Sequence, residues 1–417
     1  MVPTSKKQGM DDPGEHRWKA LGWITLAELL AMSVWFSAAA VTTALVHQWH
    51  LPVSEEPWLT ASVQLGFVGG ALLSSTLGLA DRIPLRRLMA WGSLLAAAST
   101  MALLIFSSGG WEPFVLRAVT GASLAVVYPV AVQWIAQWFP RQRGLAVGIL
   151  IGGLTVGSAL PHLLAGMPSM QNWRMVLGGS AILAIIGWAV VMWIVPDYPQ
   201  PFHPPAFRWD RIGSVLRDRP VMLANLGYWG HMWELYAMWT WLPAFLLASE
   251  AAFWHGPALI GIAGSVSFVA IGLAGFLGAL VGGWAADRFG RTMATMMAMG
   301  MSGAMALVIG LTYQQNPFWT FFVAILWGIS VIADSAQFST AVTELSPSHL
   351  LGSALTLQMA VGFLITIGSI DLVGWLAPRW GWNHVMMILA VGPIIGIAAM
   401  ARLRYQPEAM RLASGRR

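Results

Sequence analysis

The sequence contains no cysteine, which excludes both a disulfide framework and a thiolate-held metal. Its nine histidines show no metal-binding spacing such as H-E-x-x-H, and the phosphate-binding string G-x-x-x-x-G-K-[ST] is absent. Charged residues make up only 10% of the chain, against about 25% in a typical soluble protein. We therefore expect a membrane protein that has no metal site and no cofactor and that does not itself hydrolyse ATP.

Long apolar stretches fill most of the chain, which is 57% hydrophobic. A bilayer core of about 30 Å requires about 20 apolar residues per helix. Twelve stretches meet this requirement, at 20–46, 58–80, 88–107, 113–137, 144–166, 174–196, 221–248, 258–285, 292–312, 318–343, 350–377 and 384–403. They predict an all-α membrane protein with a tail at 1–19, a six-helix bundle at 20–196, a linker at 197–220, a second bundle at 221–403 and a tail at 404–417.

The basic residues predict the orientation of these spans. Twenty of the 23 lysines and arginines fall in the two tails, the central linker and the loops after the second, fourth and eighth spans. Such a bias places those segments in the cytoplasm, with both termini inside, and we expect a bacterial inner membrane. The basic residues form no continuous patch, so the pI near 9.9 does not indicate nucleic-acid binding.

An internal repeat relates the two halves of the chain. The strings "AELLAMSVW" and "WELYAMWTW" place Glu28 and Glu234 206 residues apart, and Asp81 and Asp287 have the same separation. A weaker match at an offset of 207 joins residues 121–140 to 328–347. These matches predict a duplicated six-helix unit, an architecture typical of transporters whose binding site lies between the halves near mid-bilayer.

The two halves and their loop strings resemble the major facilitator superfamily. "GWAADRFGR", after the eighth span, is similar to the family string G-x-L-A-D-R-x-G-R-K. In the first copy, Leu77 and Pro84 replace the two glycines. The resemblance implies a cytoplasmic gate that closes the inner side in one state, formed by Asp81, Arg82, Gly283, Asp287, Arg288, Gly290 and Arg291. It also implies that spans 1, 4, 7 and 10 line a central cavity.

Ionisable side chains within membrane spans are costly, so they indicate functional sites. Glu28, Arg117, Glu234 and Asp334 lie on the four spans that the resemblance places around the cavity. His231 precedes Glu234 by three residues on the same helical face, which suggests a proton relay. Buried acids outnumber the single arginine, so an acid must be protonated or a cation must neutralise it. Either possibility couples transport to charge.

Other residues are weaker candidates for a role in coupling or substrate binding. Asp371 lies near the outer end of its span, and Gln337 follows Asp334 by one helical turn. Trp35 and Trp241 could contribute to an aromatic cage for an organic cation, although packing is the commoner role of such side chains. For each of these residues the alternative is a structural hydrogen bond or ion pair.

These features predict a secondary active transporter that moves a small neutral or cationic organic solute by alternating access, coupled to protons, as a monomer in the lipid bilayer. The alternative with the same fold carries a nitrate-like or monocarboxylate-like anion, but arginines and lysines are missing from spans 2, 5, 8 and 11. A non-transporting membrane receptor is a remote alternative. No nucleophile–base pair points to an enzyme.

Overall fold

The computed structural model describes residues 13–139, 143–170, 172–196 and 207–416, and throughout these ranges the regular structure is helical. The N-terminal half contains α1 (Pro13–Met32), α2 (Thr42–Trp49), α3 (Trp58–Leu77), α4 (Leu79–Arg82), α5 (Leu85–Phe106), α6 (Glu112–Leu124), α7 (Tyr128–Trp138), α8 (Arg143–Gly166) and α9 (Trp173–Trp193). The predicted all-helical fold is confirmed. Parts of the predicted N-terminal tail, the fourth-to-fifth loop and the linker lie outside the described residues.

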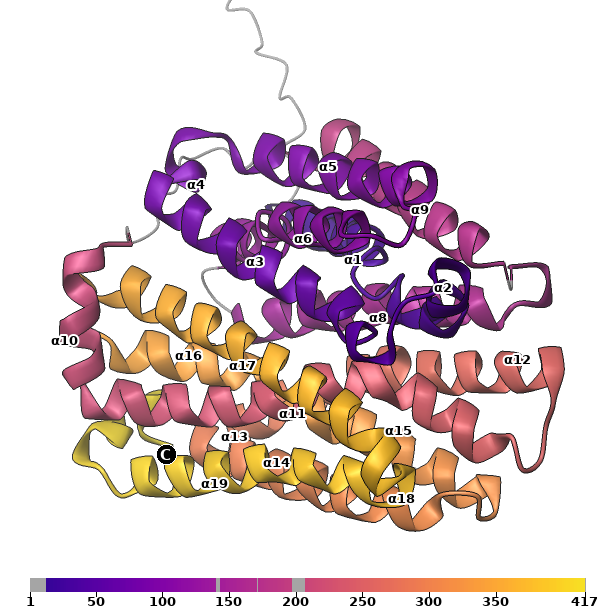
Figure 1. Ribbon diagram of the computed structural model, residues 1–417. Coiled ribbons are helices and arrows are strands. Elements are labelled where there is room, and N and C mark those ends of the chain that lie inside the picture. Colours follow the sequence, from indigo (N-terminus) through magenta and orange to yellow (C-terminus); the bar gives the residue numbers. More distant parts are fainter. Residues whose placement is uncertain (1–12, 140–142, 171, 197–206, 417) are drawn as a thin grey trace, which may run out of the picture.

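The C-terminal half repeats this plan. It contains α10 (Ile212–Arg217), α11 (Arg219–Glu250), α12 (Gly256–Ser267), the π-helical η5 (Phe268–Leu273), α13 (Ala274–Phe289), α14 (Arg291–Val308), α15 (Pro317–Ala333), α16 (Ser335–Leu345), α17 (Leu351–Trp380), α18 (Trp382–Val385) and α19 (Val391–Arg404). Figure 1 shows the two halves as separate bundles, with α8 and α3 of the first bundle facing the second.

Nine helices of the described chain are long and apolar enough to cross a membrane. The remaining three predicted spans correspond to α1 with α2, to α3 and to α11. Local chemistry determines where several helices begin. The side chains of Asn172, Asp218 and Asn316 accept hydrogen bonds from the first turns of α9, α11 and α15. Gly290 adopts a φ of 87° between α13 and α14, a conformation that favours glycine.

Three spans are interrupted within the bilayer region. The first span leaves the α-helical conformation after Met32 and resumes a regular helix only at α2, with a short 3-10 turn between. The fourth span breaks between α6 and α7, and the tenth breaks at Asp334 between α15 and α16. The last two breaks lie at equivalent places in the internal repeat, whereas α11, the counterpart of the broken first span, is continuous.

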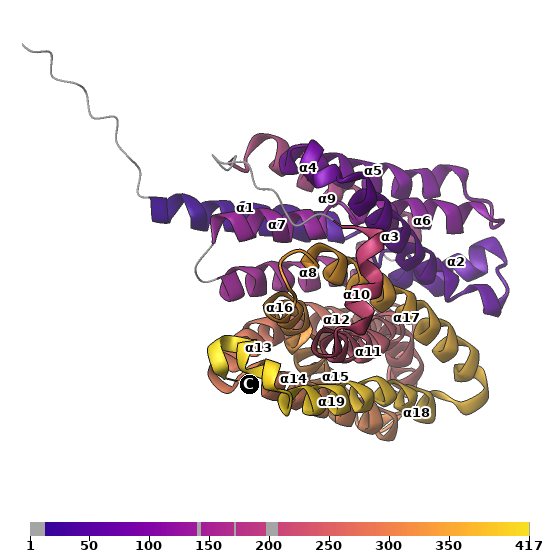
Figure 2. The ribbon, with the colours of Figure 1, turned by 90° about the vertical axis from the view of Figure 1, so that its left-hand side faces the viewer.

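The two halves meet along two pairs of spans. α8 packs against α12, η5 and α13, and α3 packs against α17. Figure 2, turned by 90° about the vertical axis, also places α8 and α3 on the side of the first bundle that faces the second. Glycines permit the close approach. A Cβ atom at Gly152 of α8 would lie 2.3 Å from the Phe276 ring of α13.

Candidate functional site

Contacts between the halves close both ends of their interface. At one end Pro57 before α3 packs against Gly374 of α17, and His162 and Gly166 of α8 pack against Gly264 of α12. At the other end Thr356 donates a 3.5 Å hydrogen bond to Ser75. These contacts narrow the interface between the two halves at both ends.

A small cavity remains between the halves. Its volume is about 20 Å³, enough for roughly one water molecule. Residues of spans 4, 5, 7, 10 and 11 form its wall. The resemblance implied a cavity lined by spans 1, 4, 7 and 10. Spans 5 and 11 therefore line the cavity in addition, while span 1 contributes no lining residue among those described. The lining residues are Tyr128, Ile151, Leu154, Tyr228, Met232, Leu235, Tyr236, Ile332, Ser335 and Phe363.

The chemistry of this wall is aromatic and hydroxylic. Three of the six tyrosines in the chain line the cavity, and no lining residue among those described is charged. Sequence reasoning based on charged residues missed these tyrosines. The available signal was their scarcity, combined with the position of Tyr128 directly after the break in span 4. Tyrosine hydroxyls can donate and accept hydrogen bonds while the rings contact apolar surface.

Glu28 is a fully buried acid on the first span. Its side chain on α1 has no measurable exposure, and neither carboxylate oxygen has a hydrogen-bond partner within the described chain. It lies near enough to interact electrostatically with Tyr128, which lines the cavity. A charged carboxylate without a hydrogen-bond partner carries a large desolvation cost in such an environment.

Glu234 has a different environment from Glu28 despite the matching sequence. Ser302 Oγ donates to Glu234 Oε2 at 2.8 Å, and Trp327 Nε1 donates to Oε1 at 2.8 Å. These donors come from α14 and α15 of the same half. The cavity-facing residues of α11 are others, including Leu235 and Tyr236. Glu234 is thus held inside the C-terminal bundle.

His231 and Asp334 form a buried pair beside Glu234. His231 Nδ1 lies 2.9 Å from Asp334 Oδ1, and both side chains are almost fully buried. Asp334 interacts electrostatically with Glu234, so the three residues form one polar cluster. The imidazole contacts the acid at the break in span 10 rather than Glu234, its partner by sequence spacing. Asp334 directly precedes Ser335 of the cavity wall.

Arg117 is fully buried and binds backbone carbonyls rather than an acid. Its Nη1 donates to the Val34 carbonyl at 2.9 Å, its Nε donates to the Leu59 carbonyl at 3.2 Å, and its Nη2 donates to the Trp35 carbonyl. Nη1 also lies within 3.3 Å of the Ser37 hydroxyl. The guanidinium therefore satisfies the carbonyls exposed by the break in the first span.

That break presents aromatic rings to the C-terminal half. Trp35 stacks on Tyr236 with ring centroids 5.7 Å apart, and its centroid lies 5.8 Å from that of Phe363. We call the whole group the aromatic seal; its members are Trp35, Phe36, Phe67, Tyr236, Trp239 and Phe363. Because Tyr236 and Phe363 also line the cavity, the seal covers the cavity on the side toward Trp239 and the Glu250 end of α11.

The remaining candidates lie away from the cavity. Trp241 is buried and donates from Nε1 to the Ile370 carbonyl at 2.9 Å, a packing role. Gln337 accepts a 2.8 Å hydrogen bond from Arg291. Asp371 is partly buried on α17. Arg379, further along the same helix, lies over the Trp375 ring at 4.0 Å.

The second copy of the loop string joins two sets of helices. Arg291 binds Glu344 through two hydrogen bonds of 2.7 and 2.8 Å, which ties α14 to α16. A Cβ atom at Gly144 would lie 3.9 Å from Asp287 Oδ2, so this carboxylate faces the start of α8 in the other half. Negative charge near a helix N-terminus is favourable. The second copy therefore contacts both its own half and the start of α8 in the other half.

The first copy is arranged differently. Gly78, with a φ of 59°, ends α3, and a Cβ atom there would lie 3.4 Å from Asp81 Oδ2. The nearby Arg86 donates to the carbonyls of Met192 and Val195 at the end of α9. Arg82 and Asp81 are exposed. Arg86, the shifted arginine, thus anchors the sixth span within the N-terminal half. In the second copy, by contrast, Asp287 faces a helix of the other half.

Comparisons with known proteins agree with this architecture. A family model described as the Major Facilitator Superfamily matches residues 24–370. The chain is 25% identical over 387 residues to a gentisate transporter of Corynebacterium glutamicum, covering 87% of this chain and 82% of the relative. It is 24% identical to the probable transporter SCO4007 of Streptomyces coelicolor, covering 96% and 91%. It is 25% identical to a D-galactonate transporter of Escherichia coli, covering 70% and 74%.

Proposed function

Because this chain belongs to the Major Facilitator Superfamily and is a multi-pass membrane transporter of small solutes rather than an enzyme, we propose that it couples movement of a small organic solute to the protonation of Glu28. The two halves rock about the central cavity between states open to each side. The family fold has twelve membrane helices in two halves, which agrees with the sequence prediction.

One observation carries the coupling proposal, namely the buried and unpartnered carboxylate of Glu28. In this structure its charge has no hydrogen-bond donor within the described chain. Closure around a charged Glu28 is therefore unfavourable by several kcal/mol. A proton removes this cost, and so does a cationic solute that reaches the carboxylate past Tyr128. The protein then changes sides only when the acid is neutral or paired, which links the two fluxes.

The cavity wall supports a solute with an aromatic or apolar body and one or two hydrogen-bonding groups. Phe363, Met232 and the faces of the tyrosines supply apolar contacts, and the tyrosine and Ser335 hydroxyls supply polar ones. No lining residue among those described carries positive charge, and the buried Arg117 binds backbone carbonyls outside the cavity wall. We infer a neutral or cationic solute as the first candidate.

An organic acid is the second candidate, and the names of relatives favour it. A gentisate transporter and a D-galactonate transporter are among the similar proteins. A hydroxylated aromatic acid would place its ring on Phe363 and its hydroxyls near the tyrosines, while a proton on Glu28 would donate to its carboxylate. In this case solute and proton move in the same direction.

We further propose that the protein is a monomer in a bacterial cytoplasmic membrane with both termini inside. The asymmetric distribution of lysine and arginine supports this orientation. It places the contacts of Asp287 and Arg291 on the cytoplasmic side and the aromatic seal toward the outer side of the cavity.

Purified protein in liposomes with an internal pH dye tests the proposal. Neutral, cationic and hydroxyaromatic anionic solutes are added in turn to otherwise identical vesicles. A pH change that depends on both solute and protein supports coupling. Its sign separates symport from exchange, and the responding solutes identify the class. Transport of a solute without any pH change contradicts the coupling, and absence of transport for every class contradicts the solute assignment.

A further inference from the structure

Gln64 of α3 is a fully buried amide without a partner. Neither its Nε2 atom nor its Oε1 atom has a hydrogen bond within the described chain. The other two buried glutamines of the described chain are paired, because Gln337 accepts a hydrogen bond from Arg291 and Gln358 donates one to Asn225. A buried amide that lacks these bonds is costly, so we expect a group from outside the chain to complete it.

Gln64 lies on the face of α3 that meets the other half of the protein. Phe67, about one helical turn further along, packs its ring with the centroid 4.3 Å from that of Phe363 on α17. Ser75, about three turns after Gln64, accepts the hydrogen bond from Thr356 of α17. Residues separated by whole turns share a helical face, so the Gln64 side chain is directed toward the interface between the halves.

Trp35 adds a second unpartnered group to the same region. Its side chain is 1% exposed and its ring centroid lies 5.1 Å from that of Phe67, yet its Nε1 atom has no acceptor within the described chain. The buried Trp241 and Trp327, by contrast, both donate hydrogen bonds from Nε1. The aromatic seal therefore holds an unused donor beside the helix face that carries the unused Gln64 amide.

These two polar groups border the central cavity without lining it. Phe363 lines the cavity and contacts the rings of both Trp35 and Phe67. Gln64 and Trp35 are one layer further out and are absent from the described cavity wall. Because α3 and α17 belong to opposite halves, the proposed rocking of the halves would separate these helices and expose both polar groups to an entering solute.

We propose that Gln64 and Trp35 bind the carboxylate of an organic acid and thereby select this class of solute. The Gln64 amide offers two N–H donors and one oxygen acceptor, and the Trp35 indole offers one further N–H. Donors outnumber acceptors, which favours a carboxylate, because both of its oxygens only accept hydrogen bonds. The Gln64 oxygen can accept from a hydroxyl group of the same solute. This inference rests on the proposed function and favours its second candidate, the hydroxylated aromatic acid.

Calorimetric titration of the purified full-length protein in detergent tests the assignment. The probes are 4-hydroxybenzoate and its methyl ester, which share the ring and the hydroxyl group and differ in the charged carboxylate. The parent protein is expected to bind the acid more tightly than the ester. Gln64→Leu and Trp35→Phe should each weaken binding of the acid by about tenfold or more, since one hydrogen bond to a charged group corresponds to that factor, and should change binding of the ester by less than about twofold.

Gln358→Leu is the matched control for a structural role of a buried amide. The Gln358 amide is bonded to Asn225 and Ser339, so its loss should lower the melting temperature. Gln64→Leu removes a group that has no partner within the described chain and should leave the melting temperature unchanged or raise it. A Gln64→Leu protein as destabilised as Gln358→Leu would overturn the inference, because the amide would then serve the fold.

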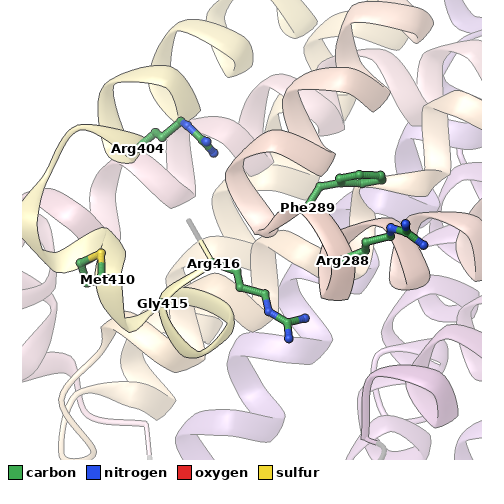
Figure 3. Close-up of a pocket in the computed structure, with 6 residues that line it drawn as sticks. All are labelled: Arg288, Phe289, Arg404, Met410, Gly415 and Arg416. Atoms are coloured by element: carbon green, nitrogen blue, oxygen red, sulfur yellow. The ribbon is translucent and has the colours of Figure 1, made fainter.

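A pocket lined by arginines offers the acid an alternative site. Figure 3 shows Arg288, Arg404 and Arg416 around this open pocket of about 390 Å³, at the ends of α13 and α19 and in the C-terminal segment. Arg416→Gln should leave binding of the acid unchanged if Gln64 and Trp35 hold the carboxylate. Loss of acid binding in Arg416→Gln but not in Gln64→Leu would overturn the inference.

Failure of this inference and failure of the proposed function give different results. A parent protein that binds the acid and the ester equally, or variants that lose both probes equally, would contradict the carboxylate assignment alone. A parent protein that binds neither probe would contradict this assignment together with the hydroxyaromatic candidate. Coupling through Glu28 is measured separately, by the pH signal in liposomes.

Discussion

The buried guanidinium of Arg117 donates a hydrogen bond to the backbone carbonyl of Trp35, 82 residues away in the sequence. This bond joins the fourth span to the broken segment of the first. The same residue that offers its carbonyl to Arg117 packs its ring on Tyr236 of the other half. Arg117 therefore holds the N-terminal side of the aromatic seal in place without touching the cavity itself.

Arg117→Met should destabilise the protein by about 3 kcal/mol, because the carbonyls of Val34, Trp35 and Leu59 lose their charged donor inside the bilayer. Thermal unfolding in detergent measures the loss. Arg174→Met, an exposed arginine at the start of α9, is the matched control and should change little. An Arg117→Met protein as stable as the parent would show that the break in the first span does not depend on the hydrogen bonds of Arg117.

Trp35→Ala should open the aromatic seal and expose the cavity to the outer solution. Since the chain has no cysteine, Ser335→Cys in the cavity wall provides a single reporter for a membrane-impermeant maleimide. Labelling from outside should be several-fold faster when Trp35→Ala is added. Trp193→Ala, at a side chain that is 71% exposed, should leave the rate unchanged. Equal rates for both tryptophan variants would argue against the seal.

Glu234→Gln should lower stability by about 1–3 kcal/mol yet preserve proton coupling. In the parent protein, Ser302 and Trp327 donate hydrogen bonds to the Glu234 carboxylate. The glutamine amide nitrogen would place a second donor against one of them. The measurement pairs a melting curve with the liposome pH assay. Loss of the solute-driven pH signal in a well-folded Glu234→Gln protein would move the coupling role to this residue, as its position in the sequence repeat predicts.

Glu56, before α3 and outside the membrane spans, predicts a pH dependence of stability. Burial raises the pKa of Glu56 above its usual value. The folded state then binds this proton more tightly than the unfolded state, so the contribution of Glu56 to stability falls as the pH rises from the unfolded to the folded pKa. Glu56→Gln should therefore raise the melting temperature at pH 7.5 more than at pH 4. The neighbouring Glu55→Gln is the control, and equal effects at both pH values would contradict the prediction.

Hydropathy and loop charge were sufficient to predict the helical fold, because membrane spans need only length and apolar side chains. They did not reveal that the first span unwinds after Met32, since Ser33 to Ala38 are as apolar as a continuous helix requires. The carbonyls of the broken segment accept hydrogen bonds from Arg117, which lies on α6. No periodic pattern in the sequence connects the two.

The candidate site illustrates a second limit of sequence reasoning. Glu28 and Glu234 occupy equivalent positions in the repeat, yet only Glu234 has buried hydrogen-bond donors within the described chain. Those donors, Ser302 and Trp327, lie on later helices whose rotation and depth are set by packing. The charged residues in the sequence pointed to the spans around the cavity. The cavity wall, however, consists of uncharged side chains, among them Tyr128 and Tyr228.

The most direct test of the account compares the parent protein with Glu28→Gln in liposomes, by solute counterflow and by solute-driven pH change. Glutamine imitates the neutral acid in shape, so counterflow across equal solute concentrations should continue. The pH change should disappear, because no proton enters or leaves at this position. A Glu28→Gln protein that still moves protons with its solute would contradict the central role of this carboxylate.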